Sequence, residues 1–538
     1  MRIGHAMLTS DQLQTVRQSL YFATRLKYAL LSLGSGLLLG LGFAPLGWWP
    51  ATILGIALFI RALNTVFWRR AAWRGYLAGV GLNLVTLSWV GVLGSFVAVG
   101  LIAVMSLWFA AFGILVSLLR QVRAWPLLIP AGWVSLEFAM SHVPFGGFPW
   151  NRLAYTAVDQ PLSGWFSLIG ATGVSFLVAL CGSLLLLVIE RRYSRRRWAY
   201  GGVLAVLLLG SGALHWLPAE PAGEMLSVGF IQGGVNRAEK GTATYARSVT
   251  GNALSETVFL LAHARTSGAP DLDFVVWPEN ATDTDPNTDP RAHGVVAAAV
   301  RITQVPILVG AVTEGPLPDT RQTTGIWWDP VTGPGDVYHK RNLVPFGEWI
   351  PFRDFLLPRF PILRQIGRQS IPGEGPGVMA APLEGLPDLK LGNVICFELA
   401  WDETVYDTVR YGGQVLVSQS NTNTYIGTGE SPQQLVMNRV RAMELGREFV
   451  AVTLNGRSGL IDTHGRVMQP TQEFTAASRI VQVGLRSNVN LPVLMGPWPS
   501  YVATLVWVVA LVWLALRRWA AARLWALVRR GRSANEPG

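Results

Sequence analysis

The sequence predicts a multi-span α-helical membrane domain with an inserted α/β domain. Two observations support this fold class. Apolar runs long enough to cross a bilayer recur along the chain, and one long stretch among them alternates short β-rich runs with helical ones. Half of the 538 residues are hydrophobic and 14% are charged, against about 25% charged residues in an average soluble chain. This composition argues against an ordinary soluble enzyme.

Eight apolar runs have the length that a helix needs to cross the hydrocarbon core of a membrane. They span residues 28–44, 49–66, 75–94, 96–119, 125–140, 164–189, 198–216 and 501–516. The first run has a long amino-terminal flank and is soon followed by a second, so we interpret it as a retained span and not as a signal peptide. The sequence therefore predicts eight transmembrane helices.

The basic residues indicate how these helices are oriented, because Lys and Arg near span ends accumulate on the cytoplasmic side. With the amino terminus inside, 21 of them lie in cytoplasmic segments and only Arg152 lies in a short outside loop. We therefore expect a bacterial cytoplasmic-membrane protein with both termini in the cytoplasm. Residues 1–217 are expected to hold seven helices, residues 218–497 to form an extracytoplasmic domain, and residues 498–538 to form the eighth helix and a basic tail.

The net charge of +11 belongs to the membrane flanks, since residues 218–497 contain more acidic than basic residues. A nucleic-acid-binding function therefore loses its support.

The two cysteines, Cys181 and Cys396, lie far apart and form neither a CxxC metal site nor a disulfide framework. We expect Cys181, in the middle of an apolar run, to serve packing, which leaves Cys396 free for chemistry.

The stretch between residues 217 and 497 is long enough for one globular domain with a substantial core. Short β-rich runs at 226–232, 274–277, 306–312, 391–397 and 415–418 alternate with helical stretches near 242–265, 291–303, 402–411 and 432–447. Such alternation predicts a layered α/β sandwich.

Three polar motifs lie beside or just after these strands. They are WPEN at 277–280, YHKRNLVPFGE at 338–348 and ICFE at 395–398. Taken singly, such residues are most often a solvated loop glutamate, a surface lysine and an inert core cysteine. The chain, however, has only four lysines, so Lys340 is not part of a generic charged surface. Polar groups at strand ends of an α/β sheet converge on a crevice, which makes a joint site plausible.

These motifs resemble the Glu-Lys-Cys triad of the nitrilase superfamily, whose fold is an αββα sandwich. Within an eight-span membrane frame, the chain is similar to the apolipoprotein N-acyltransferase family over nearly its full length. Further matching positions are Ser88-Trp89, the 147–150 loop, Ser420-Asn421, Arg439, Arg441, Ala442, Glu444, Gly446, Arg447 and Asn455-Gly456. The spacing of the three motifs makes this a specific resemblance, whereas WPE alone is weak.

The resemblance implies a role for each member of the triad. Cys396 would be the nucleophile, which needs help near neutral pH because a free thiol has a pKa of about 8.5. Glu279 would take its proton and later act as the acid. Lys340 would stabilise the oxyanion of the tetrahedral intermediate.

The resemblance also implies supporting residues. Glu348 would hold the lysine or bridge to the incoming amine, Glu398 would fix the nucleophile's loop, and a backbone N–H near Phe397 would assist Lys340; an ordinary salt bridge remains the alternative for both glutamates. Three departures from the family pattern concern donor or acceptor preference: residues 422–425 read TNTY, Phe397 replaces a common tyrosine, and a tryptophan is missing around 235–240.

The implied reaction has two steps and needs no cofactor or metal. A phospholipid gives an acyl chain to Cys396 as a thioester, and the α-amino group of a diacylglyceryl cysteine at a lipoprotein's amino terminus then attacks it. Both partners reside in the bilayer, and we expect the protein to act as a monomer. Extracting an acyl chain into water costs about 0.8 kcal/mol per CH₂, so a site close to lipid is expected.

Two other functions remain open. A membrane-tethered nitrilase-type amidase would use the same triad but let water resolve the thioester; the eight spans argue against it, because a soluble substrate needs one anchor at most. A silent scaffold or a transporter is the other alternative. Glu137 is the only carboxylate expected within the spans, which is too little for an ion pathway.

Overall fold

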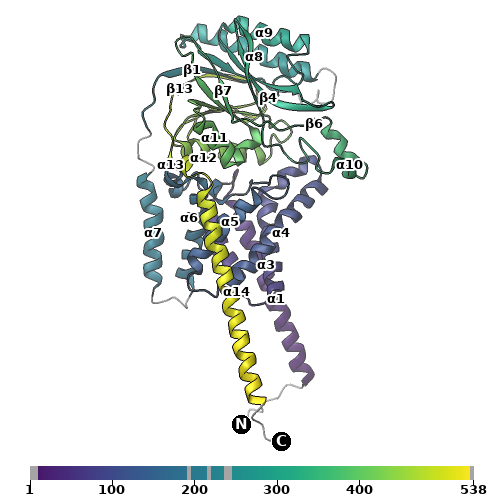
Figure 1. The fold of residues 1–538 in the computed structure, drawn as a ribbon, viewed down its shortest axis with the longest axis vertical. Helices are drawn as coiled ribbons and strands as arrows, with labels where there is room; N and C mark the ends of the chain where they lie inside the picture. Colours follow the sequence, from purple (N-terminus) through teal and green to yellow (C-terminus); the bar gives the residue numbers. More distant parts are fainter. Residues whose placement is uncertain (1–9, 191–195, 215–219, 236–244, 534–538) are drawn as a thin grey trace, which may run out of the picture. The chain divides into compact units, whose positions relative to one another are not determined.

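The computed structural model describes residues 10–190, 196–214, 220–235 and 245–533. By its internal contacts the chain forms two compact units. Unit 1 comprises residues 1–136, 178–204 and 503–538, and unit 2 comprises residues 137–177 and 205–502. The ribbon in Figure 1 carries the element labels used below. The expected domain boundaries at residues 217 and 497 stay a prediction.

A helix occupies each of the eight apolar runs. These helices are α1 (Ser10–Leu41), α2 (Trp49–Ala62), α3 (Trp68–Thr86), α4 (Ser95–Leu119), α5 (Trp125–Met140), α6 (Phe166–Ile189), α7 (Arg197–Leu214) and α14 (Trp498–Ser533). The third run differs from expectation, because α3 ends at Thr86 and the 3₁₀ helix η1 (Ser88–Leu93) follows it. Helix α6 is interrupted at Gly170, whose φ of 64° is not helical.

Four of these helical segments are long and apolar enough to cross a membrane, as judged over the described residues: 95–119, 161–189, 197–214 and 498–523. Helices α2 and α5 are shorter, with 14 and 16 residues. Helices α1 and α3 carry arginines, among them Arg25 and Arg74. The structure thus supports several spans, and the number eight remains a proposal.

Glycines allow the helices of unit 1 to approach closely. A Cβ placed on Gly36 of α1 would lie 1.9 Å from the carbonyl oxygen of Ala78 in α3. A Cβ on Gly75 of α3 would lie 2.2 Å from the carbonyl oxygen of Phe109 in α4. Small residues at helix crossings are typical of membrane bundles, where van der Waals packing takes over from the hydrophobic effect.

Unit 2 contains two β-sheets. In the first, the order is β13-β1-β2-β3-β4-β5, with β6 paired to β4; strands β1, β2 and β3 are parallel and the other neighbours of this path are antiparallel. The bounds are β1 (Met225–Gln232), β2 (Phe274–Val276), β3 (Ile307–Glu314), β4 (Thr320–Asp329), β5 (Gly333–His339), β6 (Gln369–Ser370) and β13 (Ala477–Gly484).

The second sheet has the order β12-β11-β10-β9-β8-β7, with β8, β9 and β10 parallel. Its strands are β7 (Val378–Ala380), β8 (Lys390–Ile395), β9 (Val415–Ser420), β10 (Phe449–Thr453), β11 (Gly459–Ile461) and β12 (Val467–Met468). The helices of unit 2's sandwich are α8 (Tyr245–Ser267), α9 (Pro290–Thr303), α11 (Asp402–Arg410) and α12 (Glu430–Leu445), followed by α13 (Leu491–Met495).

The two sheets pack face to face and are covered by helices on their outer sides. One buried cluster joins residues of both sheets, such as Phe230 and Trp327 from the first and Leu391 and Val417 from the second. A second cluster lies between the first sheet and α8 with α9, and includes Leu260 and Val296. Figure 1 shows α8 and α9 together on one side of the strands and α11 with α12 on the other. This is the four-layer αββα sandwich that the resemblance implied.

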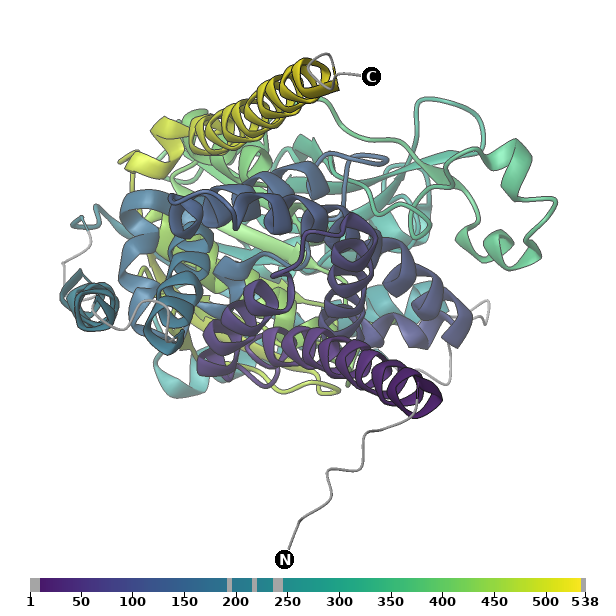
Figure 2. The same ribbon diagram turned by 90° about the horizontal axis from the view of Figure 1, so that it is seen from below.

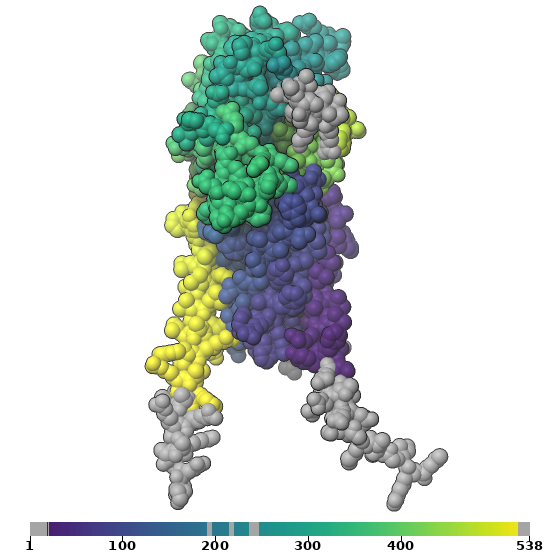
Figure 3. Space-filling view, turned by 90° about the vertical axis from the view of Figure 1, so that its right-hand side faces the viewer, coloured from purple at the N-terminus to yellow at the C-terminus, as the bar shows by residue number. Residues whose placement is uncertain are grey.

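The stretch between β5 and β6 extends beyond the sheets. It carries α10 (Arg353–Leu356) and the 3₁₀ helix η6 (Pro361–Ile366), and it exposes Phe352, Phe355 and Phe360 to a large extent. Figure 2 shows this stretch reaching outward from the strands, and it faces the viewer in Figure 3.

Candidate active site

Glu279 lies just after β2 and its side chain is buried. One carboxylate oxygen accepts a hydrogen bond from the Lys340 Nζ at 3.1 Å, and the other accepts one from the backbone N–H of Asn421 at 2.6 Å. Burial raises the pKa of this carboxyl, against the attraction of Lys340. A carboxyl with a raised pKa can exchange protons near neutral pH, as a general base requires.

Lys340 follows β5 and is only 2% exposed. Its Nζ also lies 3.0 Å from a carboxylate oxygen of Glu348, whose other oxygen accepts the Val344 N–H at 2.7 Å. Burial by itself would lower the pKa of Lys340, but the two carboxylates outweigh it and hold that pKa well above its usual value. The lysine is therefore a fixed positive charge between Glu279 and Glu348.

Cys396 stands where β8 ends and the 3₁₀ helix η7 (Cys396–Ala400) begins. Its φ is +55°, a conformation that a residue other than glycine adopts at a cost and that recurs at functional sites. The thiol belongs to a half-buried residue, and its Sγ accepts a hydrogen bond from Gln434 Nε2 at 3.3 Å. Burial and the nearby Glu279 raise the pKa of this thiol well above its usual range, so it needs a base for activation.

Glu398 is fully buried two residues after the cysteine. One oxygen accepts the N–H of Ile395 at 2.7 Å, and the other accepts the Tyr338 hydroxyl at 2.7 Å and the backbone N–H groups of Arg341 and Asn342. One carboxylate thus ties the end of the cysteine's strand to the segment that carries the lysine.

The Phe397 side chain is buried within an aromatic group. Its ring lies 4.4 Å from the Trp401 ring, 5.6 Å from the Phe148 ring and 5.9 Å from the Trp150 ring, measured between centroids. The indole N–H of Trp150 donates to Gln433 at 2.5 Å. The ring of Phe397 therefore fastens η7 to the 148–150 loop, which the sequence singled out for its family resemblance.

Helix α12 places two further polar side chains at the site that the sequence reasoning missed. Gln434 contacts the sulfur, and Glu430, the first residue of the helix, is buried one turn earlier on the same face. Burial, together with Glu279 and Glu473, raises the pKa of Glu430 to about 8. The sequence predicts this helix near 432–447, whereas α12 begins two residues earlier, at Glu430.

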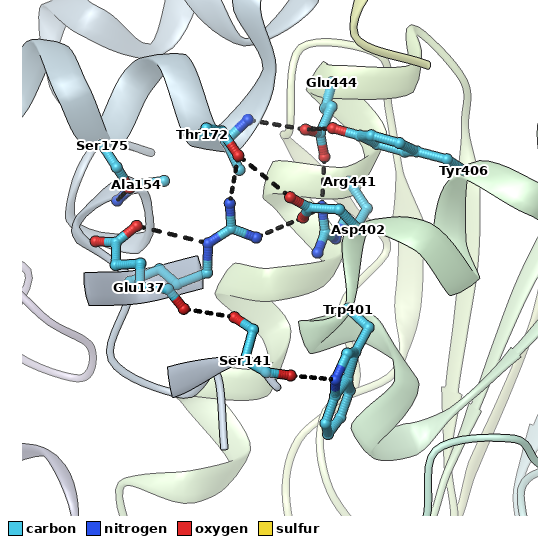
Figure 4. A network of polar contacts seen from close by, with 12 residues as sticks. Glu137, Ser141, Ala154, Thr172, Ser175, Trp401, Asp402, Tyr406, Arg441 and Glu444 are labelled. Atoms are coloured by element: carbon cyan, nitrogen blue, oxygen red, sulfur yellow. Dashed lines mark hydrogen bonds and ion pairs between the residues drawn. The ribbon is translucent and has the colours of Figure 1, made fainter. Parts of the chain in front are cut away.

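A buried ion network lies beside the site in unit 2. Arg441 of α12 donates to Asp402 at 2.8 Å and to Glu444 at 2.6 Å, and Arg152 pairs with Asp402 and lies 3.7 Å from Glu137. Figure 4 shows Arg441 between Asp402 and Glu444, with Tyr406 donating to the latter. Glu137, which the sequence singled out as a carboxylate within a span, thus has Arg152 as a cationic partner.

Two other expectations from the sequence concern Cys181 and residues 235–240. Cys181 is fully buried within α6. The region around residues 235–240, where the family tryptophan is missing, lies largely outside the described residues. Among the described residues there is no group of three or more His, Cys, Asp or Glu side chains that could hold a metal ion.

The αββα sandwich has the fold of the carbon-nitrogen hydrolase class, and Glu279, Lys340 and Cys396 follow its strands β2, β5 and β8. Residues 261–487 match the family description "Carbon-nitrogen hydrolase", and residues 35–184 match "Apolipoprotein N-acyltransferase N-terminal domain". A protein of Mycolicibacterium smegmatis named apolipoprotein N-acyltransferase is 32% identical over 87% of this chain and 81% of its own.

Two other bacteria have relatives of the same name. The one from Pseudomonas paraeruginosa is 31% identical over 83% of this chain and 88% of its own, and the one from Vibrio cholerae is 27% identical over 84% and 90%. The chain belongs to the apolipoprotein N-acyltransferase family.

Proposed function

We propose that this protein transfers an acyl chain from a membrane phospholipid, through a thioester on Cys396, to the α-amino group of the amino-terminal diacylglyceryl cysteine of lipoproteins. The relatives' name supports this activity. The observation that carries the chemistry is the buried Lys340 between two carboxylates, with a strained, half-buried cysteine beside them.

In the first step Glu279 takes the proton of the Cys396 thiol, and the thiolate attacks the ester carbonyl carbon. Because the pKa of the thiol is raised, proton transfer and attack must be coupled. The Lys340 ammonium stabilises the oxyanion together with a backbone N–H near Phe397, since the first N–H groups of a helix such as η7 lack intrahelical partners. Glu279 then protonates the departing lysophospholipid oxygen.

The supporting roles follow from the contacts. Glu348 fixes Lys340 through its short ion pair, while its second oxygen is held by the Val344 N–H. Glu398 holds the cysteine's strand end against the lysine's segment. The aromatic group around Phe397 fixes the turn that presents the sulfur.

The sidedness of the site comes from the arginine distribution. We propose eight spans, both termini in the cytoplasm, a catalytic domain at residues 218–497 outside, and action as a monomer at the bilayer surface. A fluorescent protein fused to the carboxyl terminus should then fluoresce in the cytoplasm, whereas a phosphatase, which needs an oxidising compartment, should be inactive there. The reverse pattern would refute this orientation.

Thioester trapping tests the reaction. Purified protein incubated with phospholipid carrying a labelled acyl chain should acquire label that hydroxylamine removes. Cys396→Ser should abolish this label, and Cys181→Ser is the matched control because these are the chain's only two cysteines. Label that survives in Cys396→Ser would refute the site.

The second step separates the acyltransferase from the amidase alternative. Addition of a diacylated lipopeptide with a free α-amine should move the label to the peptide as an amide. If water alone resolves the thioester and free fatty acid is the product, the protein is a hydrolase.

A further inference from the structure

Glu430 is a buried carboxylate at the active site that the first step does not use. It is 4% exposed, and among the described residues its Oε2 has no hydrogen-bond partner. Its helix neighbour Gln434, one turn further on, contacts the nucleophile's sulfur. A buried carboxylate oxygen without a partner costs free energy, so such a group calls for an explanation.

The charged and titratable groups around Glu430 come from several elements. Glu279 after β2 and Glu473 after β12 repel its negative charge, and Cys396 and Tyr425 lie within electrostatic reach of it. Glu473 is already engaged, because it pairs with Arg457 and accepts the Gly427 N–H. None of these described neighbours is a cation that pairs with Glu430. The surroundings of its carboxylate are therefore suited to bind a positively charged group.

In the second step of the proposed reaction the amino group of the acceptor loses two protons, and each of them needs a base. An α-amino group has a pKa of about 8 and arrives mostly as an ammonium ion at neutral pH. It must lose one proton before it can attack and a second one from the tetrahedral intermediate. Glu279, which returned its proton to the lysophospholipid oxygen, can accept only one of them.

We propose that Glu430 binds the ammonium group of the acceptor and accepts its first proton. This inference rests on the proposed function. The free amine then attacks the thioester carbonyl carbon, forming the C–N bond; Glu279 takes the second proton and delivers it to the sulfur as the C–S bond breaks. The products are the amide and the neutral thiol, and Glu430 releases its proton to water.

The carboxyl's own proton affinity fits this role. Burial and the acidic neighbours raise its pKa to about 8, so without the acceptor the carboxyl holds a proton at neutral pH. The positive charge of the arriving ammonium group favours the ionised carboxylate, which gives that proton to water and can then accept one from the ammonium. The neighbouring 422–425 segment departs from the family pattern, and its Tyr425 lies within electrostatic reach of both Glu430 and the sulfur.

The test measures the two steps separately in Glu430→Gln, which keeps the size of the side chain. Thioester formation should match that of the parent protein. Single-turnover transfer to a diacylated lipopeptide should be about 100-fold slower at neutral pH, as for loss of a general base, and should recover as the pH rises above the pKa of the amine. Glu430→Asp should restore part of the rate, and Glu473→Gln is the matched control that should keep it.

Hydroxylamine provides a second readout, because it is largely unprotonated at neutral pH and needs no base to become a nucleophile. It should discharge the thioester of Glu430→Gln as fast as that of the parent protein. Lipopeptide transfer that stays at the parent's rate in Glu430→Gln would overturn this inference and leave the proposed function standing. Loss of thioester formation in Glu430→Gln would also overturn it, whereas failure of the parent protein to form a thioester would overturn the proposed function itself.

Discussion

The carboxylate of Glu398 offers the sharpest test of how the site is held together. Its two oxygens accept four hydrogen bonds from donors on both sides of the site, one on Oε2 and three on Oε1. Glu398→Gln replaces one oxygen by an NH₂ group. If the amide oxygen keeps the three donors, the NH₂ group faces the N–H of Ile395, which loses its acceptor.

The expected cost follows from this count. A buried donor left without an acceptor costs about 1–3 kcal/mol, so Glu398→Gln should destabilise the protein by that amount. Glu398→Ala leaves all four donors unpaired and should cost clearly more, about 4 kcal/mol or above at roughly 1 kcal/mol per lost bond. Tyr338→Phe removes a single donor and leaves the carboxylate satisfied by the other three, so it should cost about 1 kcal/mol.

The assay combines denaturation in detergent with thioester formation. Stability should fall in the order parent, Tyr338→Phe, Glu398→Gln, Glu398→Ala, and thioester formation should fall with it, because the strand end that bears Cys396 loosens. Glu403→Gln is the matched control, since this glutamate is exposed on α11. If Glu398→Gln is as stable and active as the parent, or if Tyr338→Phe costs as much as Glu398→Ala, the reasoning is refuted.

Three further predictions concern buried charges. The pKa of Glu430, raised from 4.5 to about 8 by burial and by its acidic neighbours, means that the folded state binds this proton more tightly than the unfolded chain, so stability falls as pH rises between those values. This contribution to the unfolding free energy amounts to at most on the order of 5 kcal/mol across that window. Glu430→Gln should remove it and so flatten the dependence of Tm on pH; an unchanged slope would contradict the prediction. Arg441→Leu leaves the buried carboxylate of Glu444 without its ion-pair partner and should lower the unfolding free energy by about 3–5 kcal/mol. Arg439→Leu breaks a pair with an exposed aspartate and should cost about 1 kcal/mol or less. Lys340→Arg cannot fit the compact site of the ammonium and should slow thioester formation about 100-fold, with the exposed Lys390→Arg as a control that keeps the parent's rate.

The local pattern of apolar residues was sufficient to predict the helices and strands that border the site. The runs expected at 274–277 and 415–418 are the strands β2 and β9, and those expected at 291–303 and 402–411 are the helices α9 and α11. These segments have strong apolar periodicity because one face or both are buried. The run expected at 391–397 is two residues too long at its end, because Cys396 turns the chain into η7 with a positive φ.

The sequence did not predict several strands, among them β5 and β13, for a physical reason. Strand β5 has mostly exposed residues, so it lacks an apolar signal. Strand β13 is defined chiefly by its antiparallel pairing with β1. The two strands lie about half the chain apart in sequence. Pairing between distant segments depends on hydrogen bonds between backbones, which carry no trace in the local residue types.

The sequence by itself was sufficient to predict apolar helices, a layered α/β domain among them and three candidate catalytic side chains, because hydropathy, charge bias and motif spacing are properties of neighbouring residues. Only the tertiary structure decided which donors satisfy Glu398, that Gln434 contacts the sulfur, and that Glu430 is buried beside it without a partner for its Oε2. The contacts of Tyr338 with Glu398 and of Gln434 with the sulfur join residues 60 and 38 positions apart in the chain, and the burial of Glu430 depends on several elements at once. The free-energy cost of an unpaired polar group arises only in the folded chain, because folding removes water from the groups that it brings together.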